Sequence, residues 1–314
     1  MREVTGTRHV VAKGYCAACG AMVSRQFRPG PDGRPDATCP RCGSLERHRF
    51  LSLLLGSLSP ELRDLDTVVE IAPSRQSKVL LDRLDARRRI SLDAGYDARD
   101  VDALASLTHL PLRDGSVDLL VCYHVLEHVP DDCAAMREIA RVLSPRGIAL
   151  LEVPIKMGVA TEEDPSATPE ERLRRFGQVD HVRWYGDDFD SRLADAGLAS
   201  VRVTPPALVG ESAVRWFRLM PHEVVWVVHP GRRTASPMLA GGRGSGLTAA
   251  FDAVLGDLAK AQGRLARAQG RLARERERAA LLVAQRDGLR ARLAEVQARR
   301  PARVLTRIRR VVAL

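Results

Sequence analysis

Short apolar runs alternate with helix-like segments through the middle of the chain. The apolar runs lie at 67–71, 89–92, 117–122, 147–153, 200–203 and 223–228, and the helical segments lie at 77–85, 131–143 and 186–196. Strands that alternate with helices are typical of βαβ units around a parallel sheet. The pattern therefore predicts an α/β domain over residues 59–231, built on a doubly wound sheet.

The first 58 residues have a different pattern. A strand of alternating character runs from His9 to Tyr15, and an apolar stripe from Ser44 to Leu58 predicts a helix. Between them lie two cysteine pairs of identical spacing, Cys16-Ala-Ala-Cys19 and Cys39-Pro-Arg-Cys42. Two such pairs can hold a tetrahedral Zn²⁺ with all four positions filled, which predicts a structural zinc ribbon. Two disulfides are the alternative. They suit an oxidising compartment.

The C-terminal part is organised in heptads. Residues 232–248 are rich in glycine and predict a linker. Over 249–300 apolar residues recur every seven positions, which predicts a coiled-coil helix or a helical hairpin. In residues 301–314 a helix would separate five aliphatic side chains from four arginines. Such a basic amphipathic tail suits an anionic membrane surface or an acidic partner, with a frayed, solvated end as the alternative.

The net charge of +10 is concentrated in the C-terminal part. From Arg243 onward there are 17 Lys and Arg against 6 Asp and Glu, so the remainder holds 32 basic and 33 acidic residues. The sequence has neither an apolar leader at its start nor a run of about 18 apolar residues. We therefore expect a cytoplasmic protein, with attachment to the inner face of the membrane as an option for the tail.

One segment of the α/β domain is more specific than the rest. It reads Val121-Cys-Tyr-His-Val-Leu-Glu-His-Val-Pro130 and is followed by Asp131-Asp132 and a helix. Together with Leu110-Pro111 before it and Ile148-Ala-Leu-Leu-Glu-Val-Pro154 after it, the segment resembles class I S-adenosylmethionine-dependent methyltransferases of the small-molecule type. The resemblance covers about residues 67–230. It implies a seven-stranded, mostly parallel, Rossmann-like sheet and S-adenosylmethionine as cofactor.

The resemblance also assigns candidate cofactor residues. Ligands of such sheets bind beyond the carboxyl ends of the strands. The resemblance places Glu70 near the amino group of the cofactor, Asp93 at its ribose hydroxyls, and Tyr123 and His124 along its methionine side. The family's glycine-rich first loop is replaced here by Ile71-Ala-Pro-Ser-Arg75, so Ala72 and Pro73 would approach the cofactor. Ser106 and Leu107 stand where the family commonly has Asp-Leu at the adenine amino group.

Methyl transfer depends mainly on aligning the methyl group with its acceptor, and a base is needed only when the acceptor is a hydroxyl. Histidines titrate near neutrality and suit that role, so His128 and His181 are the catalytic candidates, with Glu127 and Tyr185 as further options. Residues 156–186 would form a lid over the substrate. Within it Thr168-Pro-Glu-Glu171 predicts a helix start. Its arginines 172, 174 and 175 face either an acidic substrate or solvent.

Three functions remain open from the sequence. The first is O-methylation of a small molecule or glycan by a zinc-ribbon methyltransferase. The second is RNA methylation, which the near-neutral body disfavours, because phosphate contacts need clustered Lys and Arg. The third is a non-catalytic scaffold that has lost cofactor binding through the altered first loop and Ser106 and works through its coiled coil. Self-association through the heptads is expected, and nucleic acid is not.

Overall fold

The computed structural model describes residues 13–31, 33–95, 100–231 and 244–298, and within the last range it describes side chains for 267–295. Two compact units are present, Met1–Asp252 and Ala253–Leu314. Both the predicted zinc ribbon and the predicted α/β domain lie inside the first unit. The predicted linker falls mostly, and the predicted basic tail entirely, outside the described residues.

A seven-stranded sheet forms the centre of the first unit. Its strand order is β10-β11-β7-β6-β3-β4-β5. The strands are β3 (Leu65–Ile71), β4 (Ala86–Asp93), β5 (Ala103–Leu104), β6 (Val117–Tyr123), β7 (Leu143–Glu152), β10 (Leu198–Val203) and β11 (Val225–Pro230). Pairing is parallel from β5 to β7, and β11 is antiparallel to both of its neighbours. This confirms the predicted fold class, an α/β fold with a seven-stranded, mostly parallel sheet.

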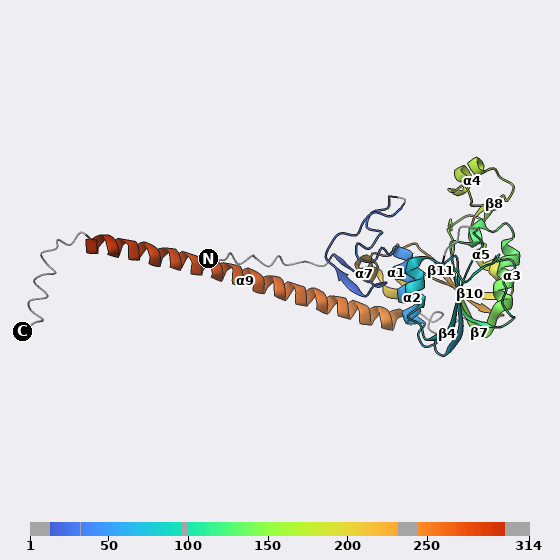
Figure 1. Cartoon of the computed structure of the whole chain (residues 1–314), viewed down its shortest axis with the longest axis horizontal. Helices are drawn as coiled ribbons and strands as arrows, with labels where there is room; N and C mark the ends of the chain where they lie inside the picture. Colours follow the sequence, from blue (N-terminus) through green and yellow to red (C-terminus); the bar gives the residue numbers. More distant parts are fainter. Residues whose placement is uncertain (1–12, 32, 96–99, 232–243, 299–314) are drawn as a thin grey trace, which may run out of the picture. The chain divides into compact units, whose positions relative to one another are not determined.

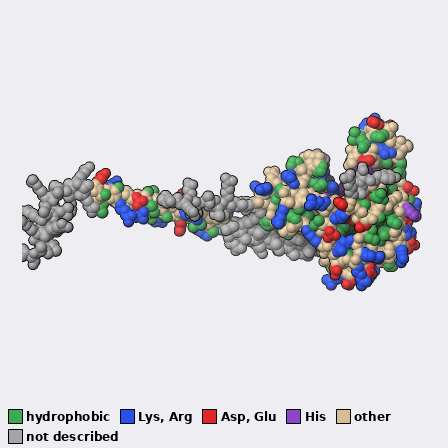
Figure 2. All heavy atoms as spheres, in the orientation of Figure 1, with side chains coloured by type: hydrophobic (Ala, Val, Ile, Leu, Met, Phe, Trp, Pro, Cys, Tyr) green, Lys and Arg blue, Asp and Glu red, His purple; other side chains and the backbone are tan. Residues whose placement is uncertain are grey.

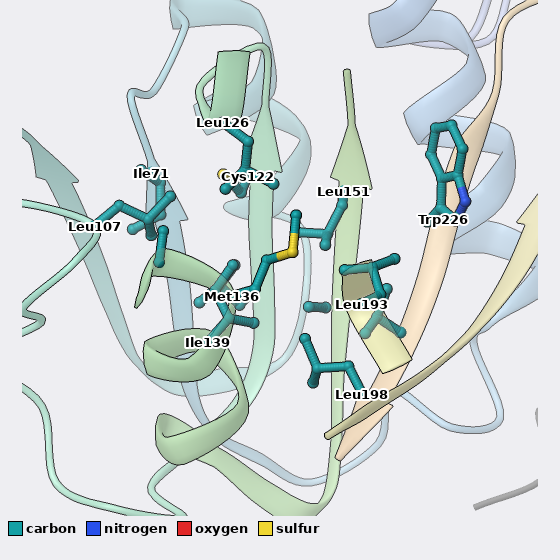
Figure 3. Close-up of a cluster of buried hydrophobic side chains, with 14 of the residues drawn as sticks. Ile71, Leu107, Cys122, Leu126, Met136, Ile139, Leu151, Leu193, Leu198 and Trp226 are labelled. Carbon is teal, nitrogen blue, oxygen red and sulfur yellow. The ribbon is translucent and has the colours of Figure 1, made fainter. Parts of the chain in front are cut away.

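Helices cover both faces of this sheet. Figure 1 shows α1 (Glu46–Ser57), α2 (Arg75–Leu81) and α7 (Glu211–Phe217) on one side, and α3 (Asp132–Val142) and α5 (Phe189–Asp195) on the other. On the second face, Met136 and Ile139 of α3 and Leu193 of α5 pack against Cys122, Leu151 and Trp226 of the sheet (Figure 3). Both Cys122 and Cys133 are expected from the sequence to be packing residues; Cys122 is buried here, whereas Cys133 on α3 is exposed. Because both faces are covered, the central strands are continuous apolar runs.

The cysteine pairs belong to a small module that packs on the sheet domain. It contains the antiparallel strands β1 (Gly14–Cys16) and β2 (Ala21–Val23), followed by a loop and α1. We refer to residues 14–45 as the cysteine module. Its partner is α7, which follows α6 (Pro205–Val209) between β10 and β11. Neither α6 nor α7 is predicted from the sequence pattern.

Arg49 of α1 connects the module to α7. Its side chain is fully buried and donates hydrogen bonds to the carbonyl oxygens of Ala37 and Ser44 in the module, each at 2.9 Å. It also donates to the carbonyls of Phe217, at 2.9 Å, and Arg218 at the end of α7. One guanidinium therefore joins backbone segments that lie about 170 residues apart in the chain.

The predicted lid contains a short hairpin and a helix. The hairpin pairs β8 (Glu162–Glu163) with β9 (Arg183–Trp184), and α4 (Pro169–Phe176) lies between them. The predicted helix start is confirmed, because the Thr168 side chain accepts from the Glu171 amide and Glu171 bonds back to the Thr168 amide. Arg175 pairs with Glu162 at 2.9 Å and Asp164 at 2.7 Å within the lid itself.

The second unit is dominated by a long helix, α9 (Gly244–Ala298). Its 55 residues are continuous, so the hairpin alternative is wrong. It begins five residues earlier than the predicted coiled coil. The heptad leucines 272, 282, 289 and 293 are exposed along it, and self-association through them stays a prediction. Within the described residues, no helix is long and apolar enough to cross a membrane.

Candidate functional site

A cleft of about 610 Å³ opens beyond the carboxyl ends of β6 and β7. Three separate segments complete its walls. The cysteine module and the start of α1 contribute Arg34, Glu46 and Arg47, the lid contributes Gln178, His181 and Trp184, and the segment before β11 contributes Met220, His222 and Glu223. The predicted residues His124, His128 and His181 all line this cleft. The cleft is therefore a candidate acceptor site.

His124 is held between two buried carboxylates. Its Nδ1 lies 3.2 Å from Glu127 Oε1 and its Nε2 lies 3.4 Å from Glu152 Oε1. Its backbone is left-handed, with φ of 57°, directly after the end of β6. Burial lowers the pKa of His124, but its bonds to the two carboxylates outweigh burial and raise that pKa to about 10. His124 is therefore charged at neutral pH and is not a base.

Glu152 and Glu223 form an acidic pair on the same wall, which the sequence analysis missed. Both are buried, at 5% and 6% exposure. Burial and the adjacent Glu152 raise the pKa of Glu223 well above its usual range, while His124 overcomes the effect of burial on Glu152 and lowers its pKa. The two directions favour the charged form of Glu152 beside His124 and the neutral form of Glu223.

The two predicted catalytic histidines meet at the lid. The rings of His128 and His181 lie edge to face with their centroids 4.7 Å apart, although 53 positions separate them in the sequence. His128 Nδ1 lies 3.2 Å from Asp180 Oδ2, and His181 Nδ1 lies 3.1 Å from the carbonyl oxygen of Phe176. Burial lowers the pKa of His181, so its imidazole is neutral near pH 7.

Arg183 holds this pair in place. It is 1% exposed and donates hydrogen bonds to the carbonyls of Leu126 at 2.8 Å, Val129, and Pro130 at 2.9 Å. These carbonyls belong to the turn around η1 (Leu126–His128), which carries His128. Tyr185, another predicted option, is buried and donates to Asp132 at 2.8 Å. It is absent from the described lining of the cleft.

The predicted cofactor residues lie along neighbouring strand ends. Ala72 follows β3 with a left-handed φ of 49°, a conformation that glycine usually takes, and its amide donates to Leu92 O at 2.8 Å. Asp93 ends β4 and is half-buried, and its Oδ1 accepts from the Gly95 amide at 2.8 Å. Pro73 lines a separate groove with Arg75 and Lys78.

The remaining cofactor candidates differ in how accessible they are. Glu70 is buried under the first turn of α2, where burial raises its pKa to about 7 despite a bond to Ser77. Leu107 is a core residue, 3% exposed, beside Ile71 (Figure 3). Ser106 bonds to the Thr108 hydroxyl at 2.7 Å. The Tyr123 hydroxyl is buried without a hydrogen-bond partner in the described part of the chain.

The four predicted zinc ligands converge in the cysteine module. Their Sγ atoms all lie within 4.8 Å of one another, and Cys16 Sγ is 3.7 Å from Cys42 Sγ. A tetrahedral ion with Zn–S bonds of about 2.3 Å needs sulfurs about 3.8 Å apart, whereas bonded sulfurs in a disulfide lie near 2.05 Å. Gly20 and Gly43 follow the two pairs with left-handed φ, and their amides turn back to the carbonyls of Cys16 and Cys39. The arrangement fits a structural zinc ion.

Comparisons with known proteins find sequence matches within the sheet domain. Residues 72–151 match the family model described as a methyltransferase domain. A Mycobacterium tuberculosis protein named "probable S-adenosylmethionine-dependent methyltransferase" is 35% identical over 98 residues, which are 31% of this chain and 32% of that protein. The chain thus spans about a third of the length of such curated relatives.

Solved structures with lower identity are also similar. An S-adenosylmethionine-dependent methyltransferase from Mesorhizobium loti is 15% identical at a TM-score of 0.40, covering 58% of this chain and 97% of that one. The 1,6-didemethyltoxoflavin-N1-methyltransferase of Burkholderia thailandensis is 14% identical at a TM-score of 0.40, covering 57% and 78%. The family match is confined to residues 72–151, which run from the loop after β3 to β7.

Proposed function

We propose that the protein transfers a methyl group from S-adenosylmethionine to a hydroxyl of a small molecule or glycan held in the cleft. The observation that carries the proposal is the convergence of His124, His128 and His181 beyond the ends of β6 and β7, in the domain that matches the methyltransferase model. In sheets of this kind, ligands bind at that edge. The bound cofactor would supply an already activated methyl group.

The cofactor would lie along the neighbouring strand ends. Asp93 ends β4 with a half-exposed carboxylate, which can accept two hydroxyl hydrogen bonds from a ribose. The left-handed Ala72 turns the chain sharply after β3, as glycine does in the family's usual first loop. Ser106 would offer the adenine edge a hydroxyl in place of a carboxylate.

The acceptor would be oriented by the other walls of the cleft. His181 is neutral and buried, and His128 lies beside it, so their imidazoles can act on a hydroxyl proton. His124 is kept charged by Glu127 and Glu152 and would position groups without exchanging a proton. Two arginines line the cleft. Arg34 forms an ion pair with Glu46 at 3.4 Å, and Arg47, the residue after Glu46, can bind an acidic group of the acceptor.

The charge distribution favours a small acceptor over RNA. Figure 2 shows Lys and Arg side chains interspersed with Asp and Glu over the visible described face of the first unit. Continuous phosphate contacts require clustered positive charge. We propose that zinc at the four cysteines is structural, since four thiolates leave no open position for a substrate.

Calorimetric titration of the zinc-loaded full chain with S-adenosylhomocysteine tests the cofactor site. We expect micromolar binding that Asp93→Ala weakens at least about 100-fold, because two hydrogen bonds to a charged acceptor are lost. Asp85→Ala is the matched control, since Asp85 is exposed and precedes the opposite end of the same strand. Absence of binding to the folded chain, or equal binding by Asp93→Ala, would contradict the proposal.

A further inference from the structure

Glu127, His128 and His181 form a cluster of side chains that can also bind a metal ion. One ligand-capable atom from each side chain lies within 4.8 Å of the others, and all three residues line the cleft. Two imidazoles and one carboxylate are a common ligand set for divalent transition ions in proteins. The cluster is separate from the four-cysteine site and comes from two different segments, η1 and the lid.

The groups that contact Nδ1 of His128 and of His181 also favour metal binding. The carbonyl oxygen of Phe176 only accepts hydrogen bonds, so it requires an N–H at His181 Nδ1. The Asp180 carboxylate lies 3.2 Å from His128 Nδ1 as an ion-pair contact and favours a proton on that nitrogen as well. That tautomer leaves Nε2 of His128 and of His181 with a free lone pair when the ring is neutral. Histidines that bind metals are usually held in this way, with the second ring nitrogen donating to a carboxylate or a carbonyl.

Glu127 supplies an independent observation. The side chain is fully buried, and its Oε1 lies 3.2 Å from His124 Nδ1. Its Oε2 is also buried and has no hydrogen-bond donor among the described residues. A buried carboxylate oxygen without a donor is costly, and a cation at the cluster would satisfy it.

The cluster is also held rigidly before any ion arrives. The Val182 amide donates to the Glu127 carbonyl at 2.9 Å. This bond joins the lid, next to His181, to η1 at Glu127. The buried Arg183 adds its bonds to the carbonyls of Leu126, Val129 and Pro130 on both sides of His128. Ligand sets fixed by their surroundings bind ions with little cost of rearrangement.

We propose that Glu127, His128 and His181 bind one divalent first-row transition ion, whose remaining coordination positions face the cleft. Mg²⁺ and Ca²⁺ are disfavoured, because two of the three ligands are nitrogens. On the premise of the proposed function, the acceptor class is then a compound with an oxygen, such as one of two adjacent hydroxyls, that can coordinate the ion. An Nε2 that binds a metal cannot take up a proton, so the ion replaces the imidazoles as the group that acts on the acceptor hydroxyl.

Mn²⁺ titration of the full chain that carries one equivalent of zinc, held by the four thiolates, tests the site. The electron paramagnetic resonance signal of free Mn²⁺ reports the unbound fraction. Mn²⁺ is a weak competitor for thiolates and leaves zinc at the cysteines. We expect one Mn²⁺ per chain, with affinity lowered at least about 100-fold by His128→Gln and by Glu127→Gln. Asp180→Asn should weaken binding about 10- to 100-fold, since it touches the ion only through His128. His222→Gln, an exposed histidine of the same cleft, should bind as the parent does.

Two controls separate the possible failures. Zinc content and thermal unfolding show whether each variant is folded, and His128 is the safest substitution because its side chain is 32% exposed. A folded parent without stoichiometric Mn²⁺, or parent-like affinity in both His128→Gln and Glu127→Gln, overturns the metal site. S-adenosylhomocysteine binding measured on the same samples reports on the proposed function, so either proposal can fail while the other stands.

Discussion

The buried carboxyl group of Glu70 should make the free energy of unfolding depend on pH, whatever the substrate is. Glu70 is 6% exposed in β3, and burial raises its pKa from the ordinary 4.5 to about 7, although Ser77 and Lys78 oppose the shift. Between these two values the folded chain holds the proton more tightly than the unfolded chain. The free energy of unfolding therefore falls as pH rises through this window, and the contribution is fully present only below about pH 4.5.

The size of the effect follows from the shift. A pKa difference of about 2.5 between the folded and the unfolded chain corresponds to about 3 kcal/mol in the free energy of unfolding. About 2.5 kcal/mol of this stabilisation is lost between pH 5 and pH 8.5. Glu70→Gln removes the ionisation and keeps the shape. We expect the variant to gain about 2.5 kcal/mol relative to the parent over that interval, measured by urea unfolding of zinc-loaded protein at both pH values.

The comparison with Asp66→Asn makes the test specific. Asp66 lies in the same strand with its side chain 64% exposed, and exposed substitutions usually change stability by less than about 0.5 kcal/mol. Its difference from the parent should be the same at pH 5 and pH 8.5. If Glu70→Gln also shows a pH-independent difference, then burial does not hold the Glu70 proton and the reasoning is refuted.

Two further predictions concern the cysteine module. Arg49→Met should lower the free energy of unfolding by about 3 kcal/mol or more, because four backbone carbonyls lose a buried donor, and parent-like urea unfolding would contradict this. Elemental analysis should find one zinc per chain beside the cysteines, absent from Cys16→Ser, and chelation should lower Tm by an amount equivalent to several kcal/mol. A Tm unaffected by chelation would show that the module folds without the ion.

The features that could be predicted from the sequence are those that depend on residues close together in the chain. The central strands are buried on both faces, so their apolar runs are visible in the sequence, and β6 differs from its predicted range by one residue. The cysteine spacing likewise predicted a cluster that the structure contains. The helices α6 and α7 are short, at five and seven residues, and carry too few turns to produce a helical period.

The composition of the cleft was less predictable, because it depends on contacts between distant segments. The sequence pointed to His128 and His181 but could not show that their Nδ1 atoms have carboxylate and carbonyl partners. Glu152 is the last residue of an apolar strand, and Glu223 precedes another. Each is unremarkable alone, and only strand pairing of β7 with β6 and β11 brings them beside His124.

The position of the cysteine module gives it a direct part in the site. Arg34 and Arg47 line the cleft, while Arg49, two residues further along α1, is bonded to the carbonyls at the end of α7. The segment after α7 supplies His222 and Glu223 to the same cleft. His48 adds a link to the first loop, since its Nε2 lies 3.1 Å from Ser74 Oγ. An ion bound at the cysteines would thus also constrain two walls of the cleft and the loop beside the proposed cofactor site.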